Sequence, residues 1–402
     1  MKTQEQRQAE AFTRVKSKHV ITYAHLAMRD LETTAYASKC GKPLDGRRVY
    51  VVGAGPSLAK NIDLLKGVSG PIMCVNASAK PLAEAGIIPD VLVARESLDL
   101  SDQIEACPAH TVALDISSHP ATWKAAGDRR VAFIPGYPRH MPLCQMLGER
   151  PVFGGTAAAT SAVALALMWG ARSVVLVGFD LSIPPDGQVY HPSAPRGDLT
   201  ASFSKEAINF EGNVEDDARC HRSGQEPPPK TVGYTKCLAL DFSQELYSQP
   251  VWNEQREWLE TTAKRYVGSV EFVNATHFGA GIVGWRNIPL GELTEGERKE
   301  PKAFHKPKGI DPEKAAQVRG VLCQQAAVLE TAAREMLSSR GPSMKTLAAI
   351  PSLHLGAPFT APLAAHRIID APPGPPLARS RHVYEAFRDV AAAAQELLAG
   401  TA

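Results

Sequence analysis

A short glycine-rich segment, Gly53-Ala54-Gly55-Pro56-Ser57-Leu58, is suited to binding a phosphorylated ligand. It follows a β-branched run, so we expect a strand, a tight turn and the start of a helix. Gly53 and Gly55 permit positive φ and close approach of a ligand, and N–H groups at a helix start attract phosphate. Ser57 adds a hydroxyl donor, whereas Pro56 and the lack of a third glycine disfavour a dinucleotide site. The segment is therefore a candidate nucleotide-phosphate site, or else an ordinary turn between strand and helix.

Other polar or small residues follow later apolar runs, where the strands of a parallel sheet bind their ligands. Asn76 is a candidate for contacting a base, sugar or phosphate, and alternatively caps a helix. Glu96 suits a ribose hydroxyl or a metal, and alternatively forms an ion pair. Gly154, Gly155 and Thr156 precede an alanine-rich helix, where small residues allow either approach of a donor phosphate or tight packing.

Candidate catalytic side chains follow the long apolar run at residues 173–177. Asp180 ends this run, and a carboxylate at such a place costs desolvation energy unless it is paired or used. Tyr190 and His191 come next along the chain, and His221 is a second imidazole. Histidine can remove a proton from a hydroxyl near neutral pH, although a loop histidine is often only a surface residue.

The elements that must position these residues are apolar runs separated by helical stretches. Continuous apolarity indicates strands buried on both faces, and intervening helices indicate parallel crossovers. We therefore predict an α/β fold with a doubly wound, mostly parallel, Rossmann-like sheet and with helical additions at both ends. The predicted strands are 48–52, 71–75, 90–94, 111–114, 131–134, 173–177 and 269–274, and the clearest helices are 79–85 and 157–169.

Changes in composition and hydrophobic pattern divide the chain into three parts. Residues 1–44 are predicted to be a helical extension, 45–293 the catalytic core, and 294–402 a proline-rich appendage with helices at 312–338 and 384–398. Within the core, residues 184–236 are polar and rich in Pro and Gly, which predicts a lid or a disordered insertion. The pattern over residues 238–266 predicts helix.

Composition argues against several classes. The formal charge is only +2, from 44 basic and 42 acidic residues, so we expect no nucleic-acid partner. The seven cysteines form no C-x-x-C pair, so neither a disulfide framework nor a metal site is expected. The sequence contains no signal-peptide core and no apolar stretch of about 20 residues, which predicts a cytoplasmic protein without a membrane span.

Taken in order, the motifs over about residues 45–293 resemble one known family. The matching pieces are Gly53–Leu58, Cys74–Ala77, Ile88–Val93, Gly154–Thr156, Trp169–Leu181 and Val273–Gly284. This family unites the motility accessory factors, which are flagellin glycosyltransferases, with the archaeal 6-hydroxymethyl-dihydropterin diphosphokinases, called MptE-like. The bacterial sialyltransferases share a related pattern.

The glycosyltransferase branch implies a nucleotide-activated nine-carbon sugar donor, such as a CMP-linked sialic-like acid, and a protein or glycan acceptor such as flagellin. The glycine turn, Asn76 and the loop at Gly155-Thr156 would hold the nucleotide. His191 would be the base, with His221 as its competitor, and Tyr190 or Tyr234 would donate to the phosphate. No cofactor is required.

The diphosphokinase branch is the alternative, with ATP and Mg²⁺. It typically carries a Thr-Asp-Leu-Asp motif where this chain has Ala94-Arg95-Glu96-Ser97, which disfavours the pterin reaction. A non-catalytic binder of nucleotide sugars is the third possibility.

Overall fold

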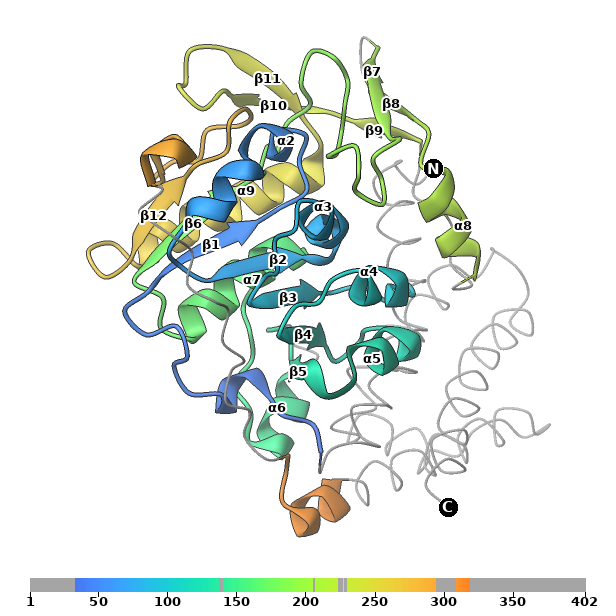
Figure 1. The fold of residues 1–402 in the computed structure, drawn as a ribbon, viewed down its shortest axis with the longest axis vertical. Helices are drawn as coiled ribbons and strands as arrows, with labels where there is room; N and C mark the ends of the chain where they lie inside the picture. The colour runs from blue at the N-terminus through green and yellow to red at the C-terminus, as the bar shows by residue number, and fades with distance from the viewer. Residues whose placement is uncertain are drawn as a thin grey trace, which may run out of the picture. The chain divides into compact units, whose positions relative to one another are not determined.

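A computed structural model of the protein describes residues 33–136, 140–204, 207–222, 227, 230–293 and 309–318. Its centre is an eight-stranded sheet with the order β13-β12-β6-β1-β2-β3-β4-β5 (Figure 1). All seven neighbouring strand pairs in this sheet are parallel. The predicted doubly wound α/β fold is thus confirmed.

Seven of the eight strands coincide closely with the predicted apolar runs, whereas the two-residue β13 was not predicted. They are β1 (Arg48–Val52), β2 (Ile72–Val75), β3 (Val91–Ala94), β4 (Thr111–Asp115), β5 (Arg130–Phe133), β6 (Ser173–Val177), β12 (Glu271–Asn274) and β13 (Arg286–Asn287). In β2, β3, β4 and β6 every residue is buried, because helices cover both faces of a parallel sheet.

Helices connect the strands and cover the sheet. They are α2 (Leu58–Asn61), α3 (Ala79–Glu84), α4 (Ser101–Glu105), α5 (Pro120–Ala126), α7 (Ala158–Met168) and α9 (Pro250–Arg265). Helix α7 packs on β1, β2 and β3 and also touches α9, whereas α3, α4 and α5 contact one another in a row (Figure 1).

The strand order reverses direction at β1. From β1 the chain adds β2 to β5 on one side, then returns to place β6 directly beside β1 on the other side. At such a reversal the loops that follow the two adjacent strands run in opposite directions, which leaves a crevice at the carboxyl ends of these strands. Ligands of open α/β sheets bind in this crevice. A ligand site is therefore expected at the loops after β1 and β6.

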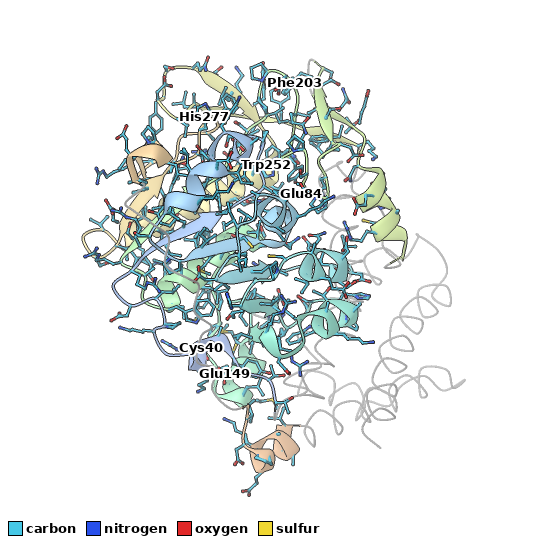
Figure 2. All side chains as sticks on the ribbon, in the orientation of Figure 1. Cys40, Glu84, Glu149, Phe203, Trp252 and His277 are labelled. Atoms are coloured by element: carbon cyan, nitrogen blue, oxygen red, sulfur yellow. The ribbon has the colours of Figure 1, made fainter. Side chains whose placement is uncertain are left out.

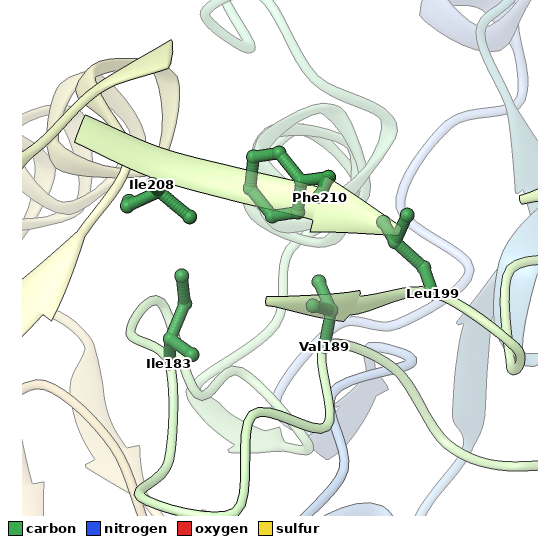
Figure 3. Close-up of a cluster of buried hydrophobic side chains, with 5 residues drawn as sticks. All are labelled: Ile183, Val189, Leu199, Ile208 and Phe210. Carbon is green, nitrogen blue, oxygen red and sulfur yellow. The ribbon is translucent and has the colours of Figure 1, made fainter. Parts of the chain in front are cut away.

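The insertion at 184–236 is folded in its described residues, so the expectation of a disordered segment is wrong for them. It contains β7 (Thr200–Phe203), β8 (Ala207–Glu211) and β9 (Thr231–Gly233) in one antiparallel sheet, together with α8 (Val214–Arg222). A buried apolar cluster supports this sheet, formed by Ile183, Val189, Leu199, Ile208 and Phe210 (Figure 3). The segment is mostly polar in composition, so the sequence did not indicate that these few apolar residues form a core. Closure of the insertion over a ligand stays a prediction.

The next segment is helical only in its second half. A hairpin of β10 (Thr235–Leu238) and β11 (Glu245–Ser248) comes first, and α9 begins with Pro250 in its first turn. The prediction of helix over 238–266 is thus wrong before Pro250. β-hairpins with exposed faces carry few apolar residues, which explains the error.

The chain divides into two compact units, of which the sheet and its helices form one. The described part of the other unit includes α6 (Met141–Leu147) and a helical stretch at residues 312–318. There the Lys314 ammonium donates a hydrogen bond to the Leu147 carbonyl at 3.0 Å. Within the predicted helical extension at 1–44, residues 1–32 lie outside the described residues, and residues 33–44 contain one short 3-10 helix, Ala37–Lys39. The helix predicted at 384–398 also lies outside the described residues. No helix in the described ranges is long and apolar enough to span a membrane.

Candidate functional site at the ends of β1 and β6

The turns after β1 and β6 touch each other directly. Gly53 N–H donates to the Val177 carbonyl at 2.8 Å, and Gly55 N–H donates to the Gly178 carbonyl at 2.9 Å. A Cβ atom on Gly53 would lie 2.6 Å from the Gly178 carbonyl oxygen, too close for any side chain. Neither Gly53 nor Gly55 has positive φ, so the expectation of positive φ is wrong for both, whereas close approach of a ligand stays a prediction. Both glycines are required by the close approach of the two turns.

Asp180 fills the space that Gly55 leaves open. A Cβ on Gly55 would overlap Asp180 Oδ2 and lie 2.7 Å from the Asp180 Cγ. The same Oδ2 accepts a hydrogen bond from Ser57 N–H at 3.2 Å. The start of α2 therefore does not offer this N–H to a phosphate in the ligand-free structure, contrary to expectation. With four residues, α2 also has a small dipole.

The Asp180 carboxyl is buried, with 3% of the residue exposed. Burial raises the pKa of Asp180 to about 7, and the hydrogen bond from the Ser57 amide offsets part of this rise. Asp180 Oδ1, Ser57 Oγ and Ser182 Oγ are buried without a hydrogen-bond partner among the described residues. Because native proteins rarely leave such groups unpaired, three of them beside one strand end point to a polar ligand or water.

The loop after β12 holds the backbone of the same turn. Phe179 N–H donates to Thr276 Oγ1 at 3.1 Å, and Ala280 N–H donates to the Asp180 carbonyl at 2.8 Å. Gly279, with φ of +134°, lies so near Asp180 that a Cβ would come within 2.6 Å of the Asp180 Cα. Three strand ends thus fix the position of Asp180.

His191 comes from the insertion but lies beside the glycine turn. Its backbone N–H donates to the Ala54 carbonyl at 2.8 Å. Its Nδ1 accepts a hydrogen bond from Ser193 N–H at 3.1 Å, so the neutral ring carries its proton on Nε2. Burial lowers the pKa of His191, and the Glu84 carboxylate partly opposes this shift. The imidazole is therefore mostly neutral at pH 7 and is a hydrogen-bond donor through Nε2.

A second cluster lies at the ends of β3 and β4. The buried Arg95 guanidinium pairs with Asp115 at 3.3 Å and donates to Ser161 Oγ at 2.9 Å. It also donates to the carbonyl oxygens of Gly154 and Gly155. Arg95 thus holds the glycine loop before α7 in place. Across the described ranges there is no group of three or more His, Cys, Asp or Glu side chains placed to bind a metal ion.

The other predicted binding residues lie along the same edge of the sheet. Half-buried Asn76 donates to Gln103 Oε1 at 2.9 Å, while Ser78 bonds the Val52 carbonyl at the end of β1. Glu96 is half-buried next to Arg95, and Thr156 is exposed beside Gly155. Neighbouring strands are about 5 Å apart, so Asn76 after β2 lies one strand from the end of β1 and Glu96 after β3 lies two strands away.

The remaining predicted catalytic residues belong to the insertion. Tyr190 is half-buried against the apolar cluster of Figure 3, and the Arg196 guanidinium lies 6.0 Å from its ring centroid. Tyr234 packs against the same cluster. His221 belongs to α8, but its side chain lies outside the described structure.

Several contributing residues had no predicted role. Thr276 and Gly279 belong to the Val273–Gly284 motif of the family resemblance. Their contacts with Phe179 and Asp180 join strands that are distant in the sequence, so the sequence alone does not predict them. Asp115 follows a predicted strand in the way Asp180 does, and the same reasoning would have found it.

The geometry defines the class of the fold, an open α/β sheet with a site at its topological switch point. Residues 27–186 match the family described as "6-hydroxymethylpterin diphosphokinase MptE-like". The resemblance expected from the motifs is confirmed over this segment.

Two curated relatives carry the name 6-hydroxymethyl-7,8-dihydropterin pyrophosphokinase. The protein from Methanocaldococcus jannaschii is 28% identical over 158 residues, covering 35% of this chain and 61% of the relative. The protein from Pyrococcus furiosus is 30% identical over 140 residues, covering 34% and 57%. The match thus spans about three fifths of each relative.

A solved structure, the MAf glycosyltransferase from Magnetospirillum magneticum AMB-1, has a similar fold. Its TM-score is 0.51 at 13% sequence identity, and the match covers 96% of this chain and 60% of that one. At this identity the likeness supports the fold alone, and it agrees with the predicted Rossmann-like architecture.

The contact between Gly55 and Asp180 predicts strong coupling between the two positions. Gly55→Ala should destabilise the protein by about 1–3 kcal/mol, because its methyl group overlaps the buried carboxyl. Asp180→Ala removes the obstacle, so the double variant should recover part of the loss in a urea-unfolding cycle. Gly233→Ala, at a glycine with open space around it, is the matched control. Strictly additive effects of the two substitutions would contradict the packing described.

The raised pKa of Asp180 predicts a pH-dependent stability. The folded-state pKa of about 7 exceeds the ordinary value near 4, so the protonated carboxyl stabilises the fold. This contribution is complete below about pH 4 and is lost as the pH rises towards 7. Relative to Asp180→Asn, the wild type should lose about 2–3 kcal/mol of unfolding free energy between pH 5 and pH 8. A pH-independent difference between the two proteins would refute the shifted pKa.

Proposed function

We propose that the protein is a glycosyltransferase that moves a sugar from a nucleotide donor to a hydroxyl acceptor. The observation that carries this proposal is the hydrogen bond from His191 N–H to the Ala54 carbonyl at 2.8 Å. It fixes the backbone of an insertion residue that carries an imidazole at the glycine turn, and the buried Asp180 carboxyl contacts the same turn at Gly55 and Ser57. A group transfer needs such a set, because the leaving phosphate must be stabilised and the acceptor hydroxyl must lose a proton.

The donor that we propose is a CMP-linked nonulosonic acid, with a protein or glycan acceptor such as flagellin. The MAf glycosyltransferase fold and the motif resemblance support this choice. The nucleotide would lie along the ends of β1, β2 and β3, against Gly53, Asn76 and the loop at Gly155-Thr156. The unpaired oxygens of Asp180, Ser57 and Ser182 supply further polar contacts next to it.

His191 fits the role of hydrogen-bond donor better than that of base. Its Nδ1 is engaged by Ser193 N–H, so proton uptake there would break a hydrogen bond and the Nε2–H group is left to bind a phosphate oxygen. Asp180, with a pKa of about 7, is the other group able to exchange a proton near neutral pH. We therefore assign His191 to the leaving phosphate and retain the base role as its alternative.

A pterin diphosphokinase is the second candidate, favoured by the names of the two curated relatives. Such a reaction uses Mg²⁺, which prefers carboxylate oxygen ligands. At the end of β3 this chain instead has the buried Arg95 cation, already paired with Asp115. This residue fits a metal site poorly, so the glycosyltransferase is the better-supported function.

The direct test compares the two reactions. Incubation with CMP-N-acetylneuraminate and lactose should release CMP as the sugar passes to a lactose hydroxyl. CMP should raise the thermal midpoint without Mg²⁺, because a ligand that prefers the folded state stabilises it. ATP with Mg²⁺ and 6-hydroxymethyl-dihydropterin should give no diphosphorylated product. Formation of that product would establish the kinase instead, whereas tight CMP binding without turnover would indicate a non-catalytic binder.

Two substitutions of His191 serve as the internal control of this assay. His191→Ala should lower turnover by about 10²- to 10³-fold, the cost of removing one donor to a developing anion. His191→Gln keeps an N–H donor and should therefore retain clearly more activity than His191→Ala. Because glutamine cannot act as a base at this pH, this variant distinguishes the donor role from the base role. Equal losses in both would return the base role to His191. His110→Ala, at the opposite end of the strands, should leave turnover unchanged.

A further inference from the structure

Three aromatic rings form a patch on the two small antiparallel sheets. Phe203 ends β7, Tyr234 lies between β9 and β10, and Tyr247 lies in β11. The ring centroids of Phe203 and Tyr247 are 4.7 Å apart, and Tyr234 meets Tyr247 edge-on at 5.0 Å. We call these three residues the aromatic platform. Figure 2 shows Phe203 at the top of the view, at the end of β7.

Two rings of the platform are partly exposed to solvent, and the third is held in place by packing on the buried cluster. Phe203 is 41% exposed and Tyr247 is 39% exposed. Tyr234 packs against the buried cluster of Ile183, Val189, Leu199, Ile208 and Phe210 (Figure 3). Exposed apolar surface that is held rigidly marks a binding site more often than chance, because little entropy is lost when a ligand docks.

Charged side chains border the rings. Lys236 lies opposite Tyr247 in the β10–β11 register, and its ammonium pairs with Glu245 at 2.7 Å. A sugar ring has an apolar C–H face, which stacks on an aromatic ring, and a rim of hydroxyls, which bond to charged groups. An apolar helix docked here would instead desolvate the Lys236–Glu245 pair, which is unfavourable.

The platform is directly connected to the candidate site. Ile183 N–H donates to the Tyr247 carbonyl at 2.9 Å, and Ser248 Oγ donates to the Leu181 carbonyl at 2.7 Å. Asp180 and Ile183 are three residues apart, at most about 11 Å along the chain. The backbone that carries the platform is therefore held close enough to Asp180 for a saccharide of two or three rings to span the separation.

We propose that the aromatic platform binds the saccharide part of the acceptor, which makes the acceptor a glycan. This inference rests on the proposed glycosyltransferase function, but the binding itself can be measured without turnover. It assigns donor and acceptor to separate surfaces, the donor at the glycine turn and the acceptor on the small sheets.

Saturation-transfer NMR with lactose, N-acetyllactosamine and chitotriose on the full-length protein tests the proposal. At least one saccharide should receive saturation at its ring C–H protons. The double variant Phe203→Leu/Tyr247→Leu keeps apolar bulk but removes both exposed rings, so it should weaken binding about tenfold or more. Val267→Ala, at a 79% exposed residue away from the platform, should bind as the wild type does.

The outcomes separate this inference from the proposed function. Absence of binding by all three saccharides, or unchanged binding by the leucine variant, would overturn the platform. Binding of a serine- and threonine-rich peptide by the wild type, with loss of that binding in the leucine variant and no saccharide binding, would assign the surface to a polypeptide acceptor and overturn it equally. CMP should raise the thermal midpoint of both proteins alike. Failure of CMP to do so in the wild type would count against the proposed function and not against the platform.

Discussion

The contact between the turns after β1 and β6 is the constraint on which the site depends. Gly53 and Gly55 have no side chains, and so the backbone of one turn can donate hydrogen bonds to the carbonyls of Val177 and Gly178 in the other. In the remaining space lies a single carboxyl group, that of Asp180. The parallel pairing of β1 with β6 sets the register of this contact.

Burial of the Asp180 carboxyl lowers the stability of the fold at neutral pH, and it also brings the pKa of this group into the range where it can exchange a proton. A carboxyl that is removed from water prefers its neutral form, and the pKa of Asp180 rises to about 7 as a result. The protein holds it there with the Ser57 amide and with the loop at Thr276–Ala280. Strained or unsatisfied groups of this kind persist where the surrounding structure fixes them, and functional sites are where they concentrate. The insertion then adds the backbone of His191 to the same turn, through its hydrogen bond to the Ala54 carbonyl.

Much of the fold was predictable from the sequence, because strands buried on both faces leave long apolar runs. The runs ending at Val52, Ala94 and Val177 mark β1, β3 and β6 correctly. The antiparallel sheets of the insertion were not predictable, since their strands are short and mostly exposed, as in β7. For the site, residue type and position at a strand end pointed to Asp180. The orientation of His191 could not be foreseen, because its Nδ1 is fixed by a local hydrogen bond from Ser193.

If a nucleotide binds at the junction of β1 and β6, hydrogen exchange of the whole protein should change when CMP is added to saturation. Exchange of the amides in residues 53–57 and 178–191 should become slower, because bound ligand blocks local opening there. Unchanged exchange in both segments at saturation, with protection elsewhere in the chain, would contradict binding at this junction.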